Sequence, residues 1–263
     1  MVRRWGILLA MLALMMGTAL FAASASASTV RAVSFRPGGP VHVVTTRQAA
    51  LAGGVSHQAE STNWSGYAAT TGTYTSVSAS WTEPAGTCKS GDQYSSLWVG
   101  LDGYNSSSVE QTGSDVDCSG KTPRYYAWYE TYPNPSVDYS STVKPGDHFS
   151  ASVTYTGSNK FSLNIADTTR GWSHTTVGTV AGAARSSAEV VVEAPCCTAS
   201  GAILPLADFG TMGIASAQAN GSAFGNAGGV TQIAMIDNAG RAKDTISSLS
   251  AAENFTATWL RGN

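Results

Sequence analysis

The sequence predicts an all-β protein whose short strands pack as two sheets, and three observations support this fold class. Short apolar or alternating runs recur from Asn63 onward, separated by Gly, Ser, Pro, Asn and Asp. No amphipathic helical pattern interrupts these runs. Only 12% of the residues are charged, whereas Ser, Thr, Gly and Ala are plentiful, as in strands with a polar outer face. Such strands form a two-sheet sandwich, a jelly roll or a barrel, so we expect one domain of about two hundred residues.

The first segment, residues 1–27, is predicted to be a secretory signal. Arg3 and Arg4 form its positive end, residues 7–20 are its apolar run, and residues 25–27 supply small side chains for cleavage. The run is too short for a comfortable membrane span and lacks a positive stop on its far side. We therefore expect a secreted, extracellular protein that leaves the membrane once the signal is removed.

Residues 28–60 differ from the rest of the chain in charge. Residues 1–59 contain five arginines and no acid, a net charge of +5. Subtracting them from the 15 basic and 17 acidic residues of the chain leaves 10 against 17, or −7, for residues 60–263. Residues 28–60 are thus interpreted as a basic propeptide on an acidic domain, or as a flexible leader. A propeptide held in this way would dissociate as carboxylates take up protons in acid.

Residues 61–263 are expected to form the β-sandwich domain. Alternation is clearest where Phe149, Ala151 and Val153 share one face of an extended segment. Examples of the predicted strands, which number ten or more, are residues 64–69, 75–81, 95–101, 125–132, 147–155, 160–166, 187–194, 203–209, 231–236 and 254–260.

The strand predicted over residues 187–194 contains two carboxylates in an otherwise apolar run. Alternation places Val190 and Val192 on one face and Glu189, Val191 and Glu193 on the other. A carboxylate fixed on the non-core face of a strand is a candidate for acid–base chemistry, because its neighbours hold its rotamer. The alternative is an ordinary solvated outer face.

Several functions lack a signal in the sequence. The net charge is −2 and no Lys/Arg cluster follows the first residues, so we expect no nucleic-acid partner. His148 and His174 are the histidines of the predicted domain, and neither lies beside a recognisable nucleophile or metal motif. A Ser/His/Asp triad assembled in space stays open as an alternative.

Four cysteines allow three disulfide pairings, which a secreted chain would form. We favour Cys88 with Cys118, because a bond between the neighbours Cys196 and Cys197 would be strained. No CxxC pair or nearby histidine accompanies them, so we expect no metal and no cofactor.

Two further segments are rich in aromatic and acidic residues. In residues 124–133, Tyr126, Trp128 and Glu130 alternate onto one face, and residues 98–113 contain a second such stretch. Aromatic faces carrying one carboxylate bind extended peptides or sugar rings. The alternative is ordinary cross-strand aromatic packing.

Six short segments together resemble the glutamic peptidases, also called eqolisins, and we interpret the chain as a secreted, bacterial-type member. The match spreads, in the family's order, over most of residues 63–210. The segments are N-W-S-G-Y at 63–67, W-V-G-L-D-G at 98–103, E-Q-T-G at 110–113, A-W-Y-E-T-Y-P at 127–133, A-E-V-V-V-E at 188–193 and L-A-D-F-G at 206–210.

This resemblance implies a concanavalin A-like β-sandwich of two antiparallel sheets that acts in acid as an endopeptidase and is made as a preproprotein. The family's catalytic pair falls on Gln111 and Glu193. The chain departs from fungal members at Tyr126, where they carry Asp. Positions that line the family's cleft or support the pair fall on Trp64, Asp102, Trp128 and Glu130.

The chemistry of the implied pair suits acid. Ionised Glu193 can take a proton from water and return it to the leaving amine, while the amide of Gln111 can donate to the oxyanion. No histidine is needed for these steps. We therefore expect a protein or peptide substrate, and a monomer, since no long apolar edge demands a partner.

Two other functions stay open on the residues alone. One is a lectin-like carbohydrate-binding sandwich without hydrolytic activity. The other is a glycosidase that uses Glu130 and Glu193 as acid and base.

Overall fold

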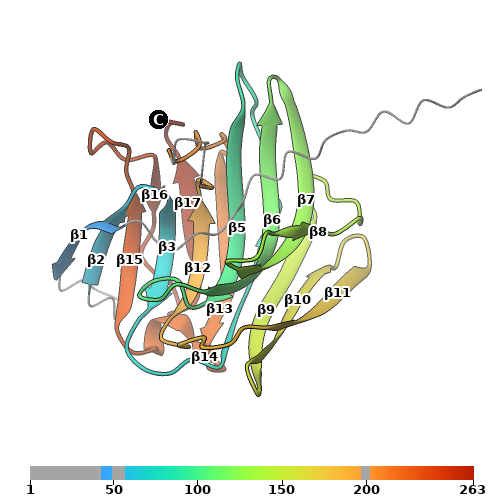
Figure 1. Ribbon diagram of the computed structural model, residues 1–263. Coiled ribbons are helices and arrows are strands. Elements are labelled where there is room, and N and C mark those ends of the chain that lie inside the picture. The colour runs from blue at the N-terminus through green and yellow to red at the C-terminus, as the bar shows by residue number, and fades with distance from the viewer. Residues whose placement is uncertain (1–42, 49–56, 197–201) are drawn as a thin grey trace, which may run out of the picture. The chain divides into compact units, whose positions relative to one another are not determined.

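The structure is a computed structural model that describes residues 43–48, 57–196 and 202–263. Its strands form two sheets (Figure 1). The nine-stranded sheet contains, in spatial order, β1 (Val43–Gln48), β2 (His57–Ser61), β15 (Val230–Met235), β3 (Trp64–Ala69), β12 (Ala188–Glu193), β5 (Gln93–Leu101), β6 (Val109–Ser119), β7 (Thr122–Tyr132) and β8 (Val137–Asp138).

The eight-stranded sheet packs against the first one. A short 3₁₀ helix, Phe224–Asn226, follows its small strand β14 (Ser222–Ala223), which pairs with β13. The remaining strands, in spatial order, are β11 (Trp172–Thr179), β10 (Lys160–Asp167), β9 (His148–Gly157), β4 (Ser76–Thr82), β13 (Thr211–Ala219), β17 (Phe255–Trp259) and β16 (Asp244–Ile246).

Neighbouring strands are antiparallel, except that β2 runs parallel to β15. The predicted fold class, an all-β sandwich of two largely antiparallel sheets, is confirmed. β1 and β2 come from the segment interpreted as a leader, and they are the last two strands at one edge of the nine-stranded sheet. The boundary expected between residues 60 and 61 therefore falls inside β2.

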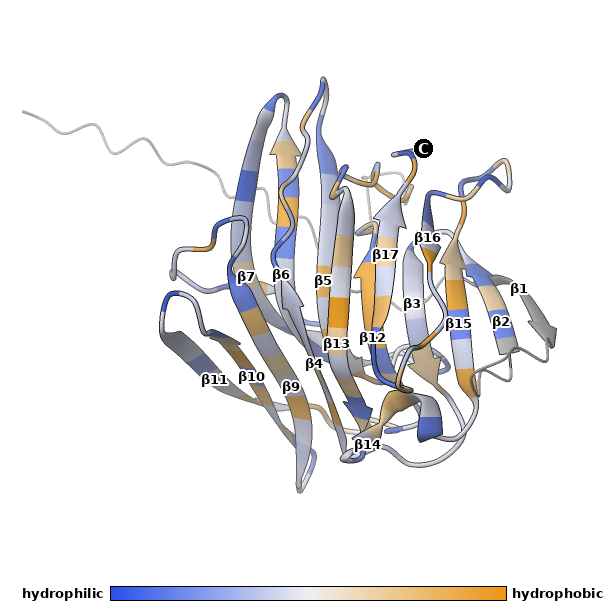
Figure 2. Ribbon diagram, turned by 180° about the vertical axis from the view of Figure 1, so that it is seen from behind, coloured by the Kyte–Doolittle hydropathy of each residue, from blue (hydrophilic) through white to orange (hydrophobic). Residues whose placement is uncertain are grey.

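The main hydrophobic core lies between the two sheets. Val190 and Val192 of β12 and Val99 of β5 meet Phe149 and Leu163 of the opposite sheet there, all at most 2% exposed. Figure 2 shows β12 as one of the most hydrophobic strands. Burying such side chains stabilises the fold by about 1.5–3 kcal/mol each.

A second, smaller cluster lies on the other face of the nine-stranded sheet. It includes Trp64, Trp98, Trp128 and Val191, which are all fully buried. Because Val191 belongs to this cluster while its neighbours Val190 and Val192 belong to the main core, the predicted alternation along β12 is confirmed.

One predicted strand is wrong. Residues 203–209 form no strand, and only Leu206 makes an isolated bridge, with Tyr94. Pro205 lacks a backbone N–H and cannot donate to a sheet ladder. The segment is instead held by single bonds, such as that from the backbone N of Tyr94 to the carbonyl oxygen of Pro205 at 2.9 Å.

The predicted disulfide between Cys88 and Cys118 is confirmed. It ties the connection before β5 to the end of β6, with a Cα–Cα distance of 5.4 Å. Cys196 is also disulfide-bonded. Cys197, for which we considered a strained bond to its neighbour, lies outside the described residues.

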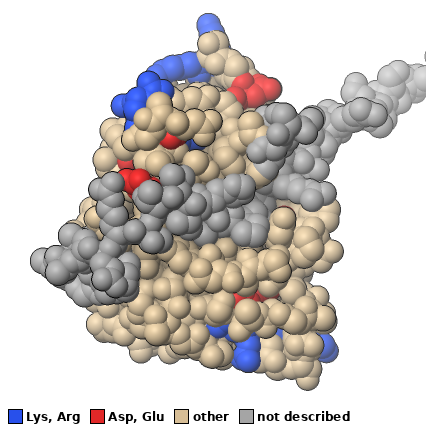
Figure 3. Space-filling model, turned by 60° about the vertical axis from the view of Figure 1, so that its left-hand side comes forward, with Lys and Arg blue, Asp and Glu red and all other residues tan. Residues whose placement is uncertain are grey.

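Uncharged residues dominate the face of the molecule seen in Figure 3. In the described part of the chain, no helix is long and apolar enough to cross a membrane.

Candidate active site

The candidate active site lies on the outer face of the nine-stranded sheet, where β12, β5, β6 and β7 are neighbours. Glu193 is paired with Ser96 of β5, and Gly100 of β5 is paired with Gln111 of β6. Gln111 is in turn paired with Glu130 of β7. Paired residues face the same side of a sheet, and so do residues two apart on one strand. All five residues therefore share one face.

Trp98 lies between the two members of the predicted pair. Its indole Nε1 donates to Oε2 of Glu193 at 2.9 Å. At the other edge of the ring, a Cβ placed on Gly100 would lie 2.8 Å from Cζ3 of Trp98 and 3.2 Å from Cβ of Gln111. A side chain at position 100 would thus collide with the indole. Glycine lets one ring fill the space between Glu193 and Gln111.

Gln111 is fully buried and oriented by Glu130. Its Nε2 donates to Oε2 of Glu130 at 2.8 Å, which leaves the second N–H of the amide available. Its carbonyl oxygen has no hydrogen-bond partner within the described residues. The amide thus offers one donor and one acceptor to a ligand.

Glu193 is fully buried as well, so the alternative of a solvated outer face is wrong for it. Besides the indole of Trp98, the side-chain amide of Asn63 contacts its Oε1 at 3.5 Å. Trp64 packs edge-on against Trp98 with ring centroids 4.9 Å apart. The indole N–H of Trp64 finds no acceptor among the described residues, so it is a donor available to a ligand.

Asp102 occupies a different place from the other predicted residues. It follows the end of β5 with φ of 68°, and its carboxylate accepts from the backbone N–H groups of Arg185 and Ser186 at 2.7 and 2.9 Å. Its side chain therefore anchors the turn that leads into β12.

Tyr126 connects two carboxyl groups further along the same face. Its hydroxyl lies 2.9 Å from Oδ2 of Asp115 and 2.6 Å from Oδ2 of Asp117. The indole Nε1 of Trp128 donates to the other carboxylate oxygen of Asp115. The residue that departs from the fungal pattern thus keeps contact with two acids on the neighbouring strand.

These two acids take up protons readily. Burial, followed by the charge of Asp117, raises the pKa of Asp115 well above its usual range, and burial raises the pKa of Asp117 to about 7. In acid, one carboxyl group can donate to the oxygen of Tyr126 while the tyrosine O–H donates to the other.

We expect Tyr126→Phe to lower the free energy of unfolding by about 1–3 kcal/mol, because it strips a hydrogen-bond partner from two buried carboxyl groups. Denaturant unfolding at about pH 4 measures the change. Tyr129→Phe is the matched control, because Tyr129 lies on the other face of β7 and its hydroxyl makes no hydrogen bond within the described chain. Equal stability of the two variants would contradict the bridging role of Tyr126.

The predictions missed two residues that contact the pair. Asn63 and Trp98 both touch Glu193. Each lies inside a segment that supports the family resemblance, so the signal was present, but the sequence alone could not show what their side chains contact. No group of three or more His, Cys, Asp or Glu side chains in the described part of the chain could hold a metal ion.

The comparisons with known proteins place this β-sandwich in the class of glutamic-type peptidases. Residues 62–259 match the family described as "Peptidase A4 family". The chain belongs to this family.

Individual relatives agree with this assignment. Aspergillopepsin-2 from Aspergillus niger is 30% identical over 190 residues, which are 63% of this chain and 67% of that protein. Scytalidopepsin B from Scytalidium lignicola is 32% identical over 139 residues, which are 50% of this chain and 51% of that protein. The structure titled "scytalido-glutamic peptidase with a transition state analog inhibitor" shares the fold, with a TM-score of 0.66 at 24% identity, over 76% of this chain and 98% of that one.

Proposed function

We propose that this glutamic-type peptidase is a secreted acid endopeptidase in which Glu193 is the general base and Gln111 the oxyanion donor. The arrangement around Trp98 carries the proposal. The indole ring of Trp98 donates a hydrogen bond to Glu193 at one edge, and its other edge lies on the side of Gly100 and Gln111. The ring therefore separates Glu193 from Gln111 on a single face of the sheet. A rigid sheet holds such groups in fixed rotamers, as catalysis requires.

In the proposed reaction, ionised Glu193 removes a proton from water as the water oxygen attacks the carbonyl carbon of the peptide. The carbonyl oxygen becomes an oxyanion and accepts a hydrogen bond from the second N–H of the Gln111 amide. The side-chain oxygen of Gln111 can hold the attacking water. The C–N bond then breaks as protonated Glu193 returns its proton to the amine nitrogen.

The residues around the pair have supporting roles in this proposal. Glu130 orients the amide of Gln111 through its 2.8 Å hydrogen bond. Trp64 offers its unpartnered indole N–H to the substrate, and Trp128 provides an apolar wall. Asp102 acts through the turn before β12. A structure titled as a member of the eqolisin family in complex with the tripeptide Ala-Ile-His supports a peptide as the substrate.

We also propose that residues 1–27 are an export signal and that residues 28–60 are a propeptide removed before activity. The match to the family begins at residue 62. β1 and β2 lie at a sheet edge, so their removal would leave the pairing of the other strands intact. The disulfide between Cys88 and Cys118 is consistent with an oxidising compartment.

Hydrolysis of a denatured protein across about pH 2–7, after acid incubation of the full chain, tests the proposal. We expect internal cleavage in the acid range that pepstatin does not inhibit, and a mature N-terminus near residue 61. A wild-type protein that is inert over the whole range would overturn the proposal. Sugar-dependent retention on a polysaccharide column would then favour the lectin-like alternative.

A further inference from the structure

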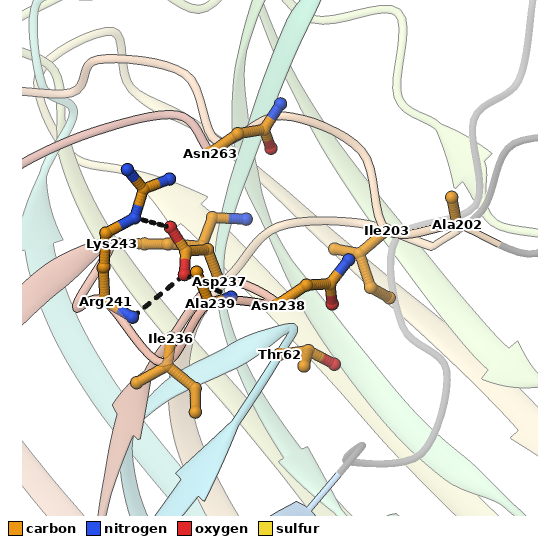
Figure 4. Close-up of a pocket in the computed structure, with 10 residues that line it drawn as sticks. All are labelled: Thr62, Ala202, Ile203, Ile236, Asp237, Asn238, Ala239, Arg241, Lys243 and Asn263. Atoms are coloured by element: carbon orange, nitrogen blue, oxygen red, sulfur yellow. Dashed lines mark hydrogen bonds and ion pairs between the residues drawn. The ribbon is translucent and has the colours of Figure 1, made fainter.

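A second candidate site is a pocket of about 700 Å³ at the end of the nine-stranded sheet (Figure 4). Thr62, just before β3, forms part of its wall, and Ile203 lines another part. The loop between β15 and β16 contributes Ile236, Arg241 and Lys243. Asn263 completes the lining, so the pocket joins four separate segments of the chain.

One lining residue of the pocket, Thr62, directly precedes a residue that contacts the proposed catalytic carboxylate. Asn63, the residue after Thr62, contacts Glu193 through its side chain at 3.5 Å and accepts from the backbone N–H of Ala194 at 2.8 Å. Consecutive Cα atoms are about 3.8 Å apart, and an extended peptide advances about 3.3 Å per residue. A substrate side chain a few residues from the cleaved bond can therefore reach the pocket.

Two of the charges in the pocket neutralise each other. Asp237 accepts from Nε of Arg241 at 2.6 Å and from the backbone N–H groups of Arg241 and Ala239 at 2.9 and 2.8 Å. The backbone hydrogen bond from Arg241 contributes most to lowering the pKa of Asp237. Because these donors favour the ionised form of Asp237, which pairs with the positive charge of Arg241, this pair adds no net charge to the pocket.

Lys243 is the remaining charged side chain of the pocket. Its side chain lines the pocket although the residue is only 3% exposed, and it makes no salt bridge with a described residue (Figure 4). The adjacent acid, Asp244, accepts from the hydroxyl of Ser65, and burial raises its pKa to about 7. Asp244 is therefore neutral in acid, whereas Lys243, whose pKa burial lowers to about 8, still carries its proton.

A largely buried lysine without an ion-pair partner is costly, and ionisable groups with perturbed pKa values cluster at functional sites. We propose that Lys243 makes this pocket a specificity subsite that binds a carboxylate of the peptide substrate. The inference rests on the proposed endopeptidase function. The carboxylate can come from an Asp or Glu side chain or from the free C-terminus of a short peptide.

A series of peptides in which a single Glu replaces Gln at each position on both sides of one cleaved bond tests this subsite. At about pH 5, we expect Glu at one position to raise kcat/KM about tenfold over Gln, equivalent to about 1.4 kcal/mol for one ion pair. Amidated and free C-termini in the same series distinguish a side-chain carboxylate from a terminal one.

Lys243→Gln is expected to abolish this preference while changing kcat/KM for the Gln peptides less than twofold. Lys160→Gln, an exposed substitution on β10 in the other sheet, should keep the preference. If Lys243→Gln does not fold, two other measurements test the subsite. The preference for Glu should persist in Lys243→Arg, which keeps the positive charge, and in the wild type it should weaken as salt is added, as expected of an ion pair.

The outcomes separate the subsite from the underlying activity. If no peptide is cleaved, the proposed function fails. If the Gln peptides are cleaved but Glu is preferred at no position, or if the preference survives in Lys243→Gln, only the subsite is overturned.

Discussion

Glu193→Gln is expected to lower kcat/KM for peptide hydrolysis in acid by about 10⁴-fold, because this carboxylate both takes the proton from water and returns it to the amine. Gln111→Ala should lower it by about 10²–10³-fold through loss of one oxyanion donor. The double variant should lose little more than Glu193→Gln alone, because the two groups act on one transition state. Steady-state kinetics at about pH 4 on a single peptide measure all three.

A matched control is available on the same strand. Glu189 is fully buried on the same face of β12 as Glu193, and burial raises its pKa well above the usual range. Glutamine resembles the protonated form of glutamate. Glu189→Gln should therefore fold like the wild type and keep kcat/KM within about threefold of the wild-type value. Full activity in either Glu193→Gln or Gln111→Ala, with folding intact, would refute the residue assignment.

The sequence predicted which way the side chains of β12 point, but not how deeply they are buried. Period-two alternation is a local property, and it correctly separated Val190 and Val192 from Glu189 and Glu193. Burial of the outer face depends on side chains that neighbouring strands bring from elsewhere in the chain, such as Trp98. The sequence of one strand does not reveal which side chains its neighbouring strands contribute.

Two segments, β6 and residues 203–209, show for opposite reasons where the hydrophobic pattern fails to indicate a strand. β6, Val109–Ser119, lacks the apolar alternation of a strand because its buried positions include Gln111, Asp115 and Asp117 of the candidate site. Residues 203–209 contain buried apolar side chains without a ladder, because Pro205 interrupts the donors. In β6, polar residues are buried in a strand, whereas in residues 203–209 apolar residues are buried without one, so the hydrophobic pattern fixes neither burial nor strand pairing.

The second prediction with a large expected effect is that the folded protein is most stable in acid and unfolds as the pH approaches neutrality. Several buried carboxyl groups have raised pKa values, in each case chiefly because burial disfavours the charged form. The pKa is about 8 for Glu83 and Glu110 and about 7 for Asp117 and Asp244. The same groups have pKa values of about 4 in an unfolded chain.

The direction of the effect follows from proton binding. Between about pH 4 and the raised pKa, the folded state holds a proton that the unfolded state has lost, so the free energy of unfolding falls as the pH rises. The contribution is fully present below about pH 4 and is lost on passing through pH 7–8. Each group contributes about 1.4 kcal/mol per pH unit over its range. Two such groups alone remove roughly 5 kcal/mol between pH 5 and 7, comparable with the total stability of many domains.

Thermal and denaturant unfolding at about pH 4, 5, 6 and 7 measure this slope directly. Glu83→Gln preserves an acceptor for the hydroxyl of Ser114, which donates to Glu83 at 2.5 Å, but cannot ionise. It should therefore match the wild type at pH 4 and exceed its stability at pH 7. Glu253→Gln, at a partly exposed position, should follow the wild type at every pH. A wild-type stability that stays level or rises from pH 4 to pH 7 would show that these carboxyl groups ionise in the folded state without penalty, and loss of activity at neutral pH would then have to arise at Glu193 and its neighbours.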